Sequence, residues 1–237
     1  MIPWLEDDAD FPPLEQALRR PNGLLAAGGE LSPERLTRAY RRGIFPWYSP
    51  GEPILWWSPD PRMVLFPSEL KIPRSFAKTL RKGAFTATAD RAFEQVIEGC
   101  GQPRRGQPGT WITAEMKQAY VALHRLGRAH SVETWLEDQL VGGLYGVAIG
   151  RAFFGESMFS RVSEASKVAL VHLVRQLDHW EFGLIDCQMR TPLLASFGAR
   201  EIPRSEFTRR LAELVNYPEI PAPWQLTPID ARKNTRP

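Results

Sequence analysis

The chain has 237 residues, 43% of them hydrophobic, which is enough for a packed core in one large domain or in an ordinary domain with a small one. Apolar runs such as 140–148 are shorter than the roughly 20 residues of a membrane span, and the acidic N-terminus is unlike a signal peptide. A disordered chain and a membrane protein are therefore disfavoured, and we expect a cytoplasmic protein. The formal net charge of +3 is uneven, because residues 71–128 contain 11 Lys and Arg against 4 Asp and Glu. This region suits a phosphate backbone or a solvated basic face equally well.

The first 62 residues are rich in Pro, Gly and Trp. One helix is expected there, over Ser32–Arg42, because its first residue can cap it, Pro33 suits its first turn and Gly43 can end it. Proline-bounded segments around this helix favour extended and turn conformations. The composition predicts a small N-terminal domain over 1–62 and a larger domain over 63–237.

A second helix is expected over Pro73–Lys82, ending at Gly83. Its cations recur at spacings of three and four residues, which places them on one side of the helix. This basic face consists of Arg74, Lys78, Arg81 and Lys82. It is a candidate for contact with nucleic-acid phosphates.

Beyond the loop 99–109, helical and strand patterns alternate. The expected elements are a helix Ala114–Leu126, strands His130–Trp135, Leu140–Ala148 and Ala152–Phe159, a helix Ala165–Trp180, a strand Leu184–Gln188, a helix Leu193–Phe197, a strand Arg200–Ile202 and a helix Glu206–Val215. Short turns between the first three strands imply antiparallel pairing. The order predicts an α/β (α+β) fold with a mixed, largely antiparallel sheet, and it resembles the GCN5-type N-acyltransferase fold. The loop 159–167 lacks the glycines that hold the acyl-CoA pyrophosphate in those enzymes, which disfavours an acyl-CoA donor.

Two acidic residues lie within apolar strand patterns. Asp186 is flanked by Ile185 and Cys187, and it needs a polar partner if it is buried. Gln188 lies two residues further along, so simple alternation places it on the same side of the strand. Glu156 is the second acid, and two such acids make a catalytic site more plausible than one. A purely structural Asp that accepts backbone hydrogen bonds remains the alternative for Asp186.

A series of motifs resembles the leucyl/phenylalanyl-tRNA-protein transferase family from about residue 11 to residue 214. In chain order the motifs are Pro21-Asn22-Gly23-Leu24-Leu25-Ala26 with Gly28-Gly29, Arg42-Gly43-Ile44-Phe45-Pro46-Trp47, Ile54-Leu55-Trp56-Trp57-Ser58-Pro59-Asp60-Pro61-Arg62, Gly109-Thr110-Trp111-Ile112-Thr113, Val141-Gly142-Gly143, Gly155-Glu156-Ser157-Met158-Phe159-Ser160 and Ile185-Asp186-Cys187-Gln188. Each motif alone is weak, whereas the whole series in this order is specific.

The resemblance implies an aminoacyltransferase that takes Leu or Phe, and Met less readily, from aminoacyl-tRNA. The acceptor would be the N-terminal amine of proteins that begin with Arg or Lys, which would mark them for degradation through the N-degron pathway. No cofactor and no metal are implied, and we expect a cytoplasmic monomer that does not bind membranes.

The resemblance also implies roles for individual residues. Asp186 would bind the attacking amine and receive its proton, Gln188 would fix the ester, and Glu156 would hold polar groups of the substrate. Four residues would form the apolar pocket for the donor side chain: Leu144, Phe153, Met158 and Ile185. Three aromatic residues would surround the aminoacyl-adenosine: Trp47, Trp111 and Tyr120. The basic face would bind tRNA.

Three other functions remain open at this stage. An acyl-CoA-dependent N-acetyltransferase would suit the fold. A non-catalytic RNA-binding module would explain the basic face, although it leaves Asp186, Gln188 and Glu156 unexplained. A peptidoglycan-building aminoacyl-tRNA transferase would share the donor and the fold, but its chain is typically longer because its domains are duplicated.

Overall fold

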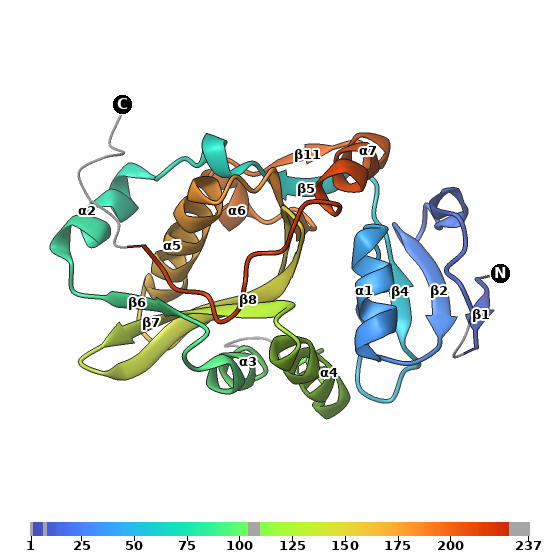
Figure 1. The fold of residues 1–237 in the computed structure, drawn as a ribbon, viewed down its shortest axis with the longest axis horizontal. Helices are drawn as coiled ribbons and strands as arrows, with labels where there is room; N and C mark the ends of the chain where they lie inside the picture. Colours follow the sequence, from blue (N-terminus) through green and yellow to red (C-terminus); the bar gives the residue numbers. More distant parts are fainter. Residues whose placement is uncertain (1, 7–8, 104–109, 228–237) are drawn as a thin grey trace.

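The computed structural model describes residues 2–6, 9–103 and 110–227. Its N-terminal part is a small sheet with strand order β1-β2-β4-β3. The elements of this part are β1 (Trp4–Leu5), the 3-10 helix η1 (Leu14–Gln16), β2 (Leu24–Gly28), α1 (Pro33–Arg41), β3 (Phe45–Pro46) and β4 (Leu55–Trp57). Figure 1 shows these elements side by side at the right of the molecule, with α1 facing the larger part.

The larger part is built on a seven-stranded sheet with strand order β11-β5-β10-β9-β8-β7-β6. Its strands are β5 (Arg62–Leu65), β6 (Thr86–Ala89), β7 (Ala129–Leu136), β8 (Gln139–Ile149), β9 (Ala152–Ser160), β10 (Leu184–Gln188) and β11 (Arg200–Ile202). All neighbours are antiparallel except β9 and β10, which are parallel. The mixed, largely antiparallel sheet confirms the predicted fold class, and the parallel pair brings the C-terminal ends of β9 and β10 together.

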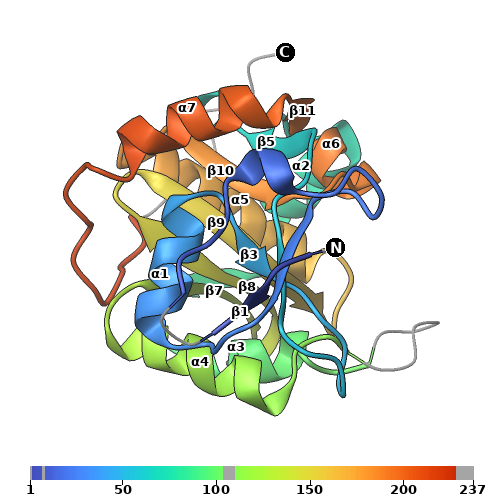
Figure 2. The same ribbon diagram turned by 90° about the vertical axis from the view of Figure 1, so that its right-hand side faces the viewer.

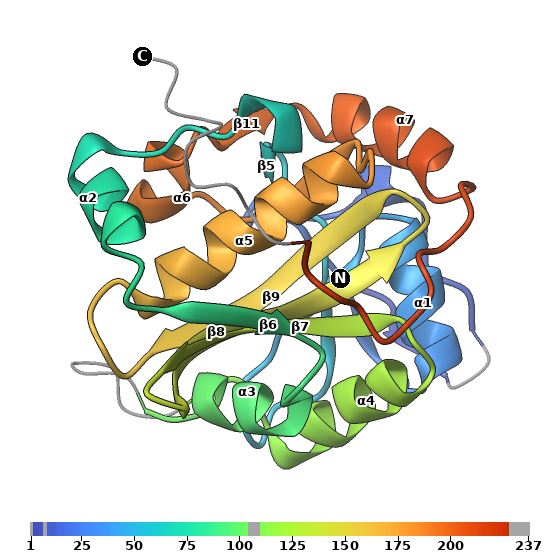
Figure 3. The same cartoon turned by 60° about the vertical axis from the view of Figure 1, so that its left-hand side comes forward.

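Helices cover both sides of this sheet. The remaining helical elements are η2 (Pro67–Glu69), α2 (Arg74–Lys82), α3 (Phe93–Cys100), α4 (Ala114–Arg125), α5 (Ala165–His179), α6 (Pro192–Ser196) and α7 (Arg204–Leu214). On β8, Tyr145 and Val147 belong to the hydrophobic cluster that includes α3 and α4, whereas Leu144 and Ala148 belong to the cluster that includes α5. Figure 3 shows α5 lying across the strands, with α3 and α4 below them.

The small sheet and the larger part share a core. Tyr40 of α1 packs against Phe154 of β9 with ring centroids 5.0 Å apart. Figure 2 views the molecule from the side of the N-terminal part, and it shows α7 above this part and α4 below it. Arg62, where we expected the first domain to end, is the first residue of a strand in the large sheet. A domain boundary there stays a prediction.

Local signals in the sequence explain where the first two long helices begin and end. The Ser32 side chain accepts a hydrogen bond from the Arg35 amide at 3.2 Å, and Pro33 occupies the first turn of α1. Gly83 ends α2 in the left-handed conformation, with φ of 63°. Left-handed backbone suits glycine because it has no Cβ. Both predicted helices are confirmed to within a residue.

The predicted elements after residue 110 are also confirmed, with ends that differ by no more than two residues. Four elements of the large sheet and its cover were not predicted: β5, η2, β6 and α3. β6 is a short edge strand of half-exposed Thr and Ala residues, and α3 is only eight residues long. Such short elements carry little periodicity, so they depend on tertiary contacts. Residues 104–109 of the predicted loop lie outside the described residues.

Candidate active site

A cavity of about 400 Å³ opens beside the C-terminal ends of β9 and β10. Much of its lining is apolar, and it includes all four predicted pocket residues: Leu144, Phe153, Met158 and Ile185. Leu170 and Leu173 of α5 also line this part. Antiparallel pairing brings Leu144 of β8 opposite Met158 of β9, and parallel pairing brings Phe153 opposite Ile185. The sheet register therefore assembles the apolar lining from three neighbouring strands.

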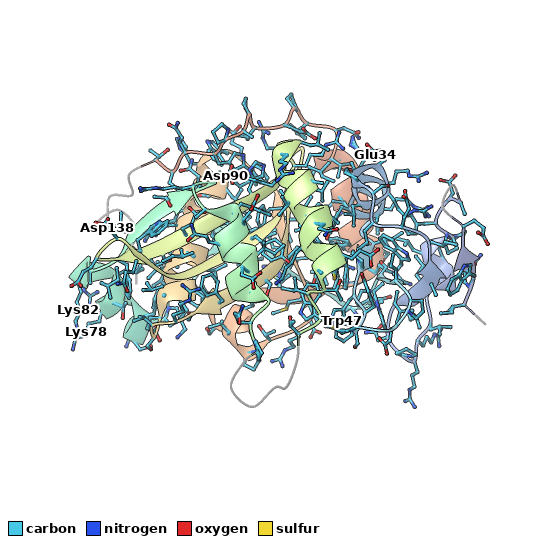
Figure 4. All side chains as sticks on the ribbon, turned by 90° about the horizontal axis from the view of Figure 1, so that it is seen from below. Glu34, Trp47, Lys78, Lys82, Asp90 and Asp138 are labelled. Carbon is cyan, nitrogen blue, oxygen red and sulfur yellow. The ribbon has the colours of Figure 1, made fainter. Side chains whose placement is uncertain are left out.

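The aromatic residues predicted around the adenosine fall into two groups. Trp47 and Trp111 line the cavity, and Trp47 is 38% exposed. Trp47 is labelled in Figure 4. Tyr120 is fully buried on α4 and is not part of the lining. Its hydroxyl group donates a hydrogen bond to Glu156 Oε2 at 2.8 Å. The Tyr120 side chain is therefore enclosed behind Glu156 in this structure and reaches the cavity only through that carboxyl group.

The polar end of the cavity is formed by Glu156 and Gln188. Gln188 Nε2 donates to Glu156 Oε1 at 3.0 Å, and the Tyr40 hydroxyl donates to the same oxygen at 2.7 Å. Tyr40 was not predicted as a site residue, because its position on α1 gives no sign of a contact 116 residues away. The cavity thus joins an apolar side-chain pocket to a carboxyl and amide pair, which is the combination that a ligand with one apolar group and one reactive polar group requires.

Burial is the main influence on the ionisation of Glu156. It raises the pKa of this carboxyl group to about 7, and the nearby charge of Asp186 adds to the increase. The hydrogen bonds from Tyr40, Tyr120 and Gln188 act in the opposite direction, because they stabilise the carboxylate. Glu156 can therefore gain or lose a proton near neutral pH, which suits a group that takes part in acid–base chemistry.

Asp186 has the polar partner that its burial requires, and that partner is Arg62 of β5. The two side chains form a bidentate pair, with Nε to Oδ1 at 2.8 Å and Nη2 to Oδ2 at 2.6 Å. Both side chains are almost completely inaccessible, and Asp186 is not part of the cavity lining. The Arg62 guanidinium also lies over the rings of Phe45 and Phe207. In this arrangement the Asp186 carboxylate is turned away from the cavity.

A bulge in β10 explains why Asp186 and Gln188 point in different directions. Asp186 pairs with Val64 of β5 and Gln188 pairs with Met63, so Cys187 is the extra residue. Gln188 has a left-handed backbone with φ of 61°, and its amide donates to Asp186 Oδ1 at 2.9 Å. Simple alternation is therefore wrong at this position. The Asp186 carboxylate instead stabilises the turn that brings Gln188 to Glu156.

The two cysteines lie in different surroundings. Cys100 is buried, whereas Cys187 lines the cavity. Burial raises the pKa of the Cys187 thiol well above its ordinary range, so the group is neutral and a poor nucleophile. Within the described residues, no group of three or more His, Cys, Asp or Glu side chains is placed to hold a metal ion.

The basic face of α2 lies on the surface. All four of its cations are exposed, and none of them forms an ion pair within the described part of the chain. The opposite side of the helix is anchored by Phe76, which packs against Phe197 with ring centroids 5.6 Å apart. Figure 4 shows Lys78 and Lys82 at the end of the molecule remote from Trp47. A ligand that contacts both regions must extend over the surface.

None of the helices in the described residues is both long enough and apolar enough to cross a membrane.

Comparisons with known proteins agree along nearly the whole chain. Residues 64–212 match the family model described as "Leucyl/phenylalanyl-tRNA protein transferase", and residues 29–60 match the model of the N-terminal domain of the same family. A relative from Nitrosospira multiformis, named leucyl/phenylalanyl-tRNA--protein transferase, is 65% identical over 94% of this chain and 97% of its own length. A relative of the same name from Nitrosomonas europaea is 66% identical over 94% and 95%.

Similar solved structures are far more distant in sequence. L-PGS from Bacillus licheniformis is 12% identical, with a TM-score of 0.38 over 72% of this chain and 57% of that one. A GCN5-related N-acetyltransferase from Kribbella flavida is 11% identical, with a TM-score of 0.35 over 70% and 59%.

Proposed function

The chain belongs to the leucyl/phenylalanyl-tRNA protein transferase family and is therefore an aminoacyltransferase, and we propose that it moves Leu or Phe, and Met less readily, from aminoacyl-tRNA to proteins. The acceptor in this proposal is the α-amine of a protein that begins with Arg or Lys. The product would enter the N-degron pathway of protein degradation in the cytoplasm. The observation that carries the proposal is the cavity in which an apolar pocket ends at Glu156 and Gln188.

The donor side chain is proposed to occupy the apolar part of the cavity. Leu144, Met158 and Ile185 offer flexible or branched aliphatic surface that can adapt to either Leu or Phe. None of the described residues that line this part is charged, so a charged donor side chain would lose its hydration without gaining a partner. Trp47 and Trp111, which both line the cavity, are proposed to stack on the terminal adenosine.

The reaction is aminolysis of an ester, which needs positioning more than it needs a strong base. An N-terminal amine has an ordinary pKa of about 7.7 to 8.0, so part of it is already neutral near pH 7. Gln188 Nε2 uses one hydrogen for Glu156, which leaves a second hydrogen for the ester carbonyl oxygen and its developing negative charge. Gln188 is thus proposed to hold the ester, and Glu156 to act beside it.

Asp186 is proposed as a positioning residue rather than as the group that receives the proton. Its carboxylate is occupied by Arg62 and by the Gln188 amide, and it is shielded from the cavity. The contribution of Asp186 to catalysis would be the conformation that it imposes on Gln188.

The tRNA is proposed to contact the basic face of α2 while its acceptor end reaches the cavity. Four exposed cations without carboxylate partners in the described part of the chain are suited to phosphates. The separation between Lys78 and Trp47 in Figure 4 fits a ligand of extended shape. We also propose that the chain acts as a monomer.

The deciding experiment measures transfer of radiolabelled leucine from charged tRNA to a peptide that begins with Arg, compared with the same peptide beginning with Ala. We expect labelling of the Arg peptide, with loss of transfer but retained tRNA binding in Gln188→Ala and Asp186→Ala. Equal labelling of both peptides would contradict the proposed acceptor. Tight tRNA binding without any transfer would instead support the RNA-binding alternative.

A further inference from the structure

Three buried side chains from different elements form a closed ring beside the cavity. Tyr40 and Tyr120 contact the two carboxyl oxygens of Glu156 at 2.7 and 2.8 Å, and their own hydroxyl oxygens are 2.5 Å apart. Both Tyr side chains are at most 1% exposed, whereas Glu156 is 9% exposed and reaches the cavity wall. Each member of this acid–tyrosine ring (Tyr40, Tyr120 and Glu156) contacts the other two, and Glu156 connects the ring to the cavity.

Counting hydrogen atoms shows that the ring can hold either two or three of them. With Glu156 ionised, the two hydroxyl hydrogens must serve three oxygen–oxygen contacts. With Glu156 protonated on Oε2, the acid can donate to Tyr120, Tyr120 to Tyr40, and Tyr40 to Oε1, so that every member donates once and accepts once. Oε2 is the favoured position, because Oε1 already accepts from Gln188. Each contact is then satisfied without movement of any heavy atom.

The surroundings of the ring make Glu156 the member that exchanges its proton. Burial raises the pKa values of both tyrosines well above their ordinary value, so they stay protonated. Burial also raises the pKa of Glu156 to about 7. The titratable and charged groups packed around Glu156 come from five elements: Tyr40 of α1, Tyr120 of α4, Tyr145 of β8, Asp186 and Cys187 of β10, and Arg62 of β5 behind Asp186.

We propose that the acid–tyrosine ring is the proton-holding site of the transfer reaction, an inference that rests on the proposed function. The amine nitrogen attacks the ester carbon, and the new C–N bond leaves that nitrogen with one proton too many. The Glu156 carboxylate takes this proton, which supplies the third hydrogen of the ring. The C–O bond then breaks with its electron pair on the ribose oxygen, and Glu156 returns the proton to that oxygen. The ring ends in its starting state.

The test is the pH dependence of single-turnover leucine transfer from pre-bound leucyl-tRNA to one Arg-initiated peptide. Tyr40→Phe and Tyr120→Phe each remove one donor to the carboxylate, so the acidic limb should move to higher pH by roughly 1 unit, the equivalent of one hydrogen bond. Glu156→Gln should lower the rate by about 10²- to 10⁴-fold. It should also remove the contribution of the acid–tyrosine ring to the acidic limb of the pH–rate profile. The titration of the amine is the same in every variant, so the differences report on the ring.

Tyr48→Phe is the matched control. Its hydroxyl contacts Thr113 and Glu115 outside the cavity, so its profile should superimpose on that of the wild type. Thermal melting and leucyl-tRNA binding identify any variant that fails to fold. In that case, the infrared carbonyl band of the Glu156 acid, assigned by its loss in Glu156→Gln, gives the titration midpoint directly.

Three results would overturn the inference: ring-tyrosine variants with the wild-type profile, a Glu156→Gln enzyme at the wild-type rate, or an infrared midpoint in the ordinary range of a glutamic acid. A wild-type protein that transfers no leucine at all would overturn the proposed function and this inference with it. Normal transfer with an unmoved acidic limb would overturn the ring alone.

Discussion

Replacing Arg62 by Met is expected to destabilise the protein by about 3 to 5 kcal/mol, because the Asp186 carboxylate would stay buried without its counter-ion. The side chains of this pair are 0% and 1% exposed, so water cannot replace the guanidinium without a change in the fold. Two of the hydrogen bonds to the carboxylate would disappear, and the one from the Gln188 amide would remain. For a chain of this length, the loss corresponds to a fall in Tm of roughly 6 to 20 °C.

Urea unfolding and thermal melting of the wild type and Arg62→Met measure this effect. Arg200→Met is the matched control, because Arg200 pairs with Glu69 at the surface, where both side chains are about half exposed. An exposed pair contributes about 0 to 1 kcal/mol. A cost for Arg62→Met no greater than that of Arg200→Met would refute the reasoning.

A double variant separates the two roles of Asp186. Arg62→Met combined with Asp186→Leu removes both charges, so much of the lost stability should return. Transfer activity should be lost in the double variant, because the Gln188 amide would lack its Asp186 acceptor. A double variant that is less stable than Arg62→Met alone would contradict the stability argument, and one with wild-type activity would contradict the positioning role.

Three further predictions concern other parts of the molecule. Replacing the four cations of the basic face of α2 by Gln should weaken tRNA binding. The slope of log binding constant against log salt concentration should flatten by about 0.9 for each lost duplex phosphate contact. Filter binding at several salt concentrations checks this, and an unchanged slope would count against the assignment. Leu144→Phe should narrow the pocket and lower Phe transfer relative to Leu transfer on the order of tenfold, measured with both charged tRNAs in competition; an unchanged ratio would place the donor side chain elsewhere. Burial raises the pKa of Asp90, but the hydrogen bond and the charge of His130 outweigh it, so the pKa of Asp90 is lowered. The stability that Asp90 adds is therefore present above the ordinary pKa of an aspartic acid, and it is lost as the pH falls through the lowered value. Asp90→Asn should therefore be less stable than the wild type at neutral pH and should approach it in acid, and urea unfolding with a constant deficit across this range would contradict the linkage.

Local sequence signals were sufficient for most of the secondary structure. Ser32 and Pro33 mark the start of α1, and Gly83 marks the end of α2, because capping and left-handed backbone depend on a few neighbouring residues. Strand alternation and short turns were sufficient for the β7-β8-β9 meander. The short elements β5, β6 and α3 were missed, because they owe their conformation to the sheet and core that they join.

The sequence by itself also determined the family, since a long series of motifs can be read without a fold, and it identified four of the apolar residues that line the cavity. It indicated that Asp186 needs a polar partner if buried, but it could not name Arg62, which lies 124 residues away. Tyr40 and Tyr120 are separated from Glu156 by 116 and 36 residues, so only the packing of α1 and α4 against the sheet creates their ring. The bulge at Cys187, which turns Gln188 toward the cavity and Asp186 away from it, depends on pairing with β5. Side-chain direction beyond a bulge and hydrogen bonds between distant segments are properties of the tertiary structure, because no local periodicity encodes them.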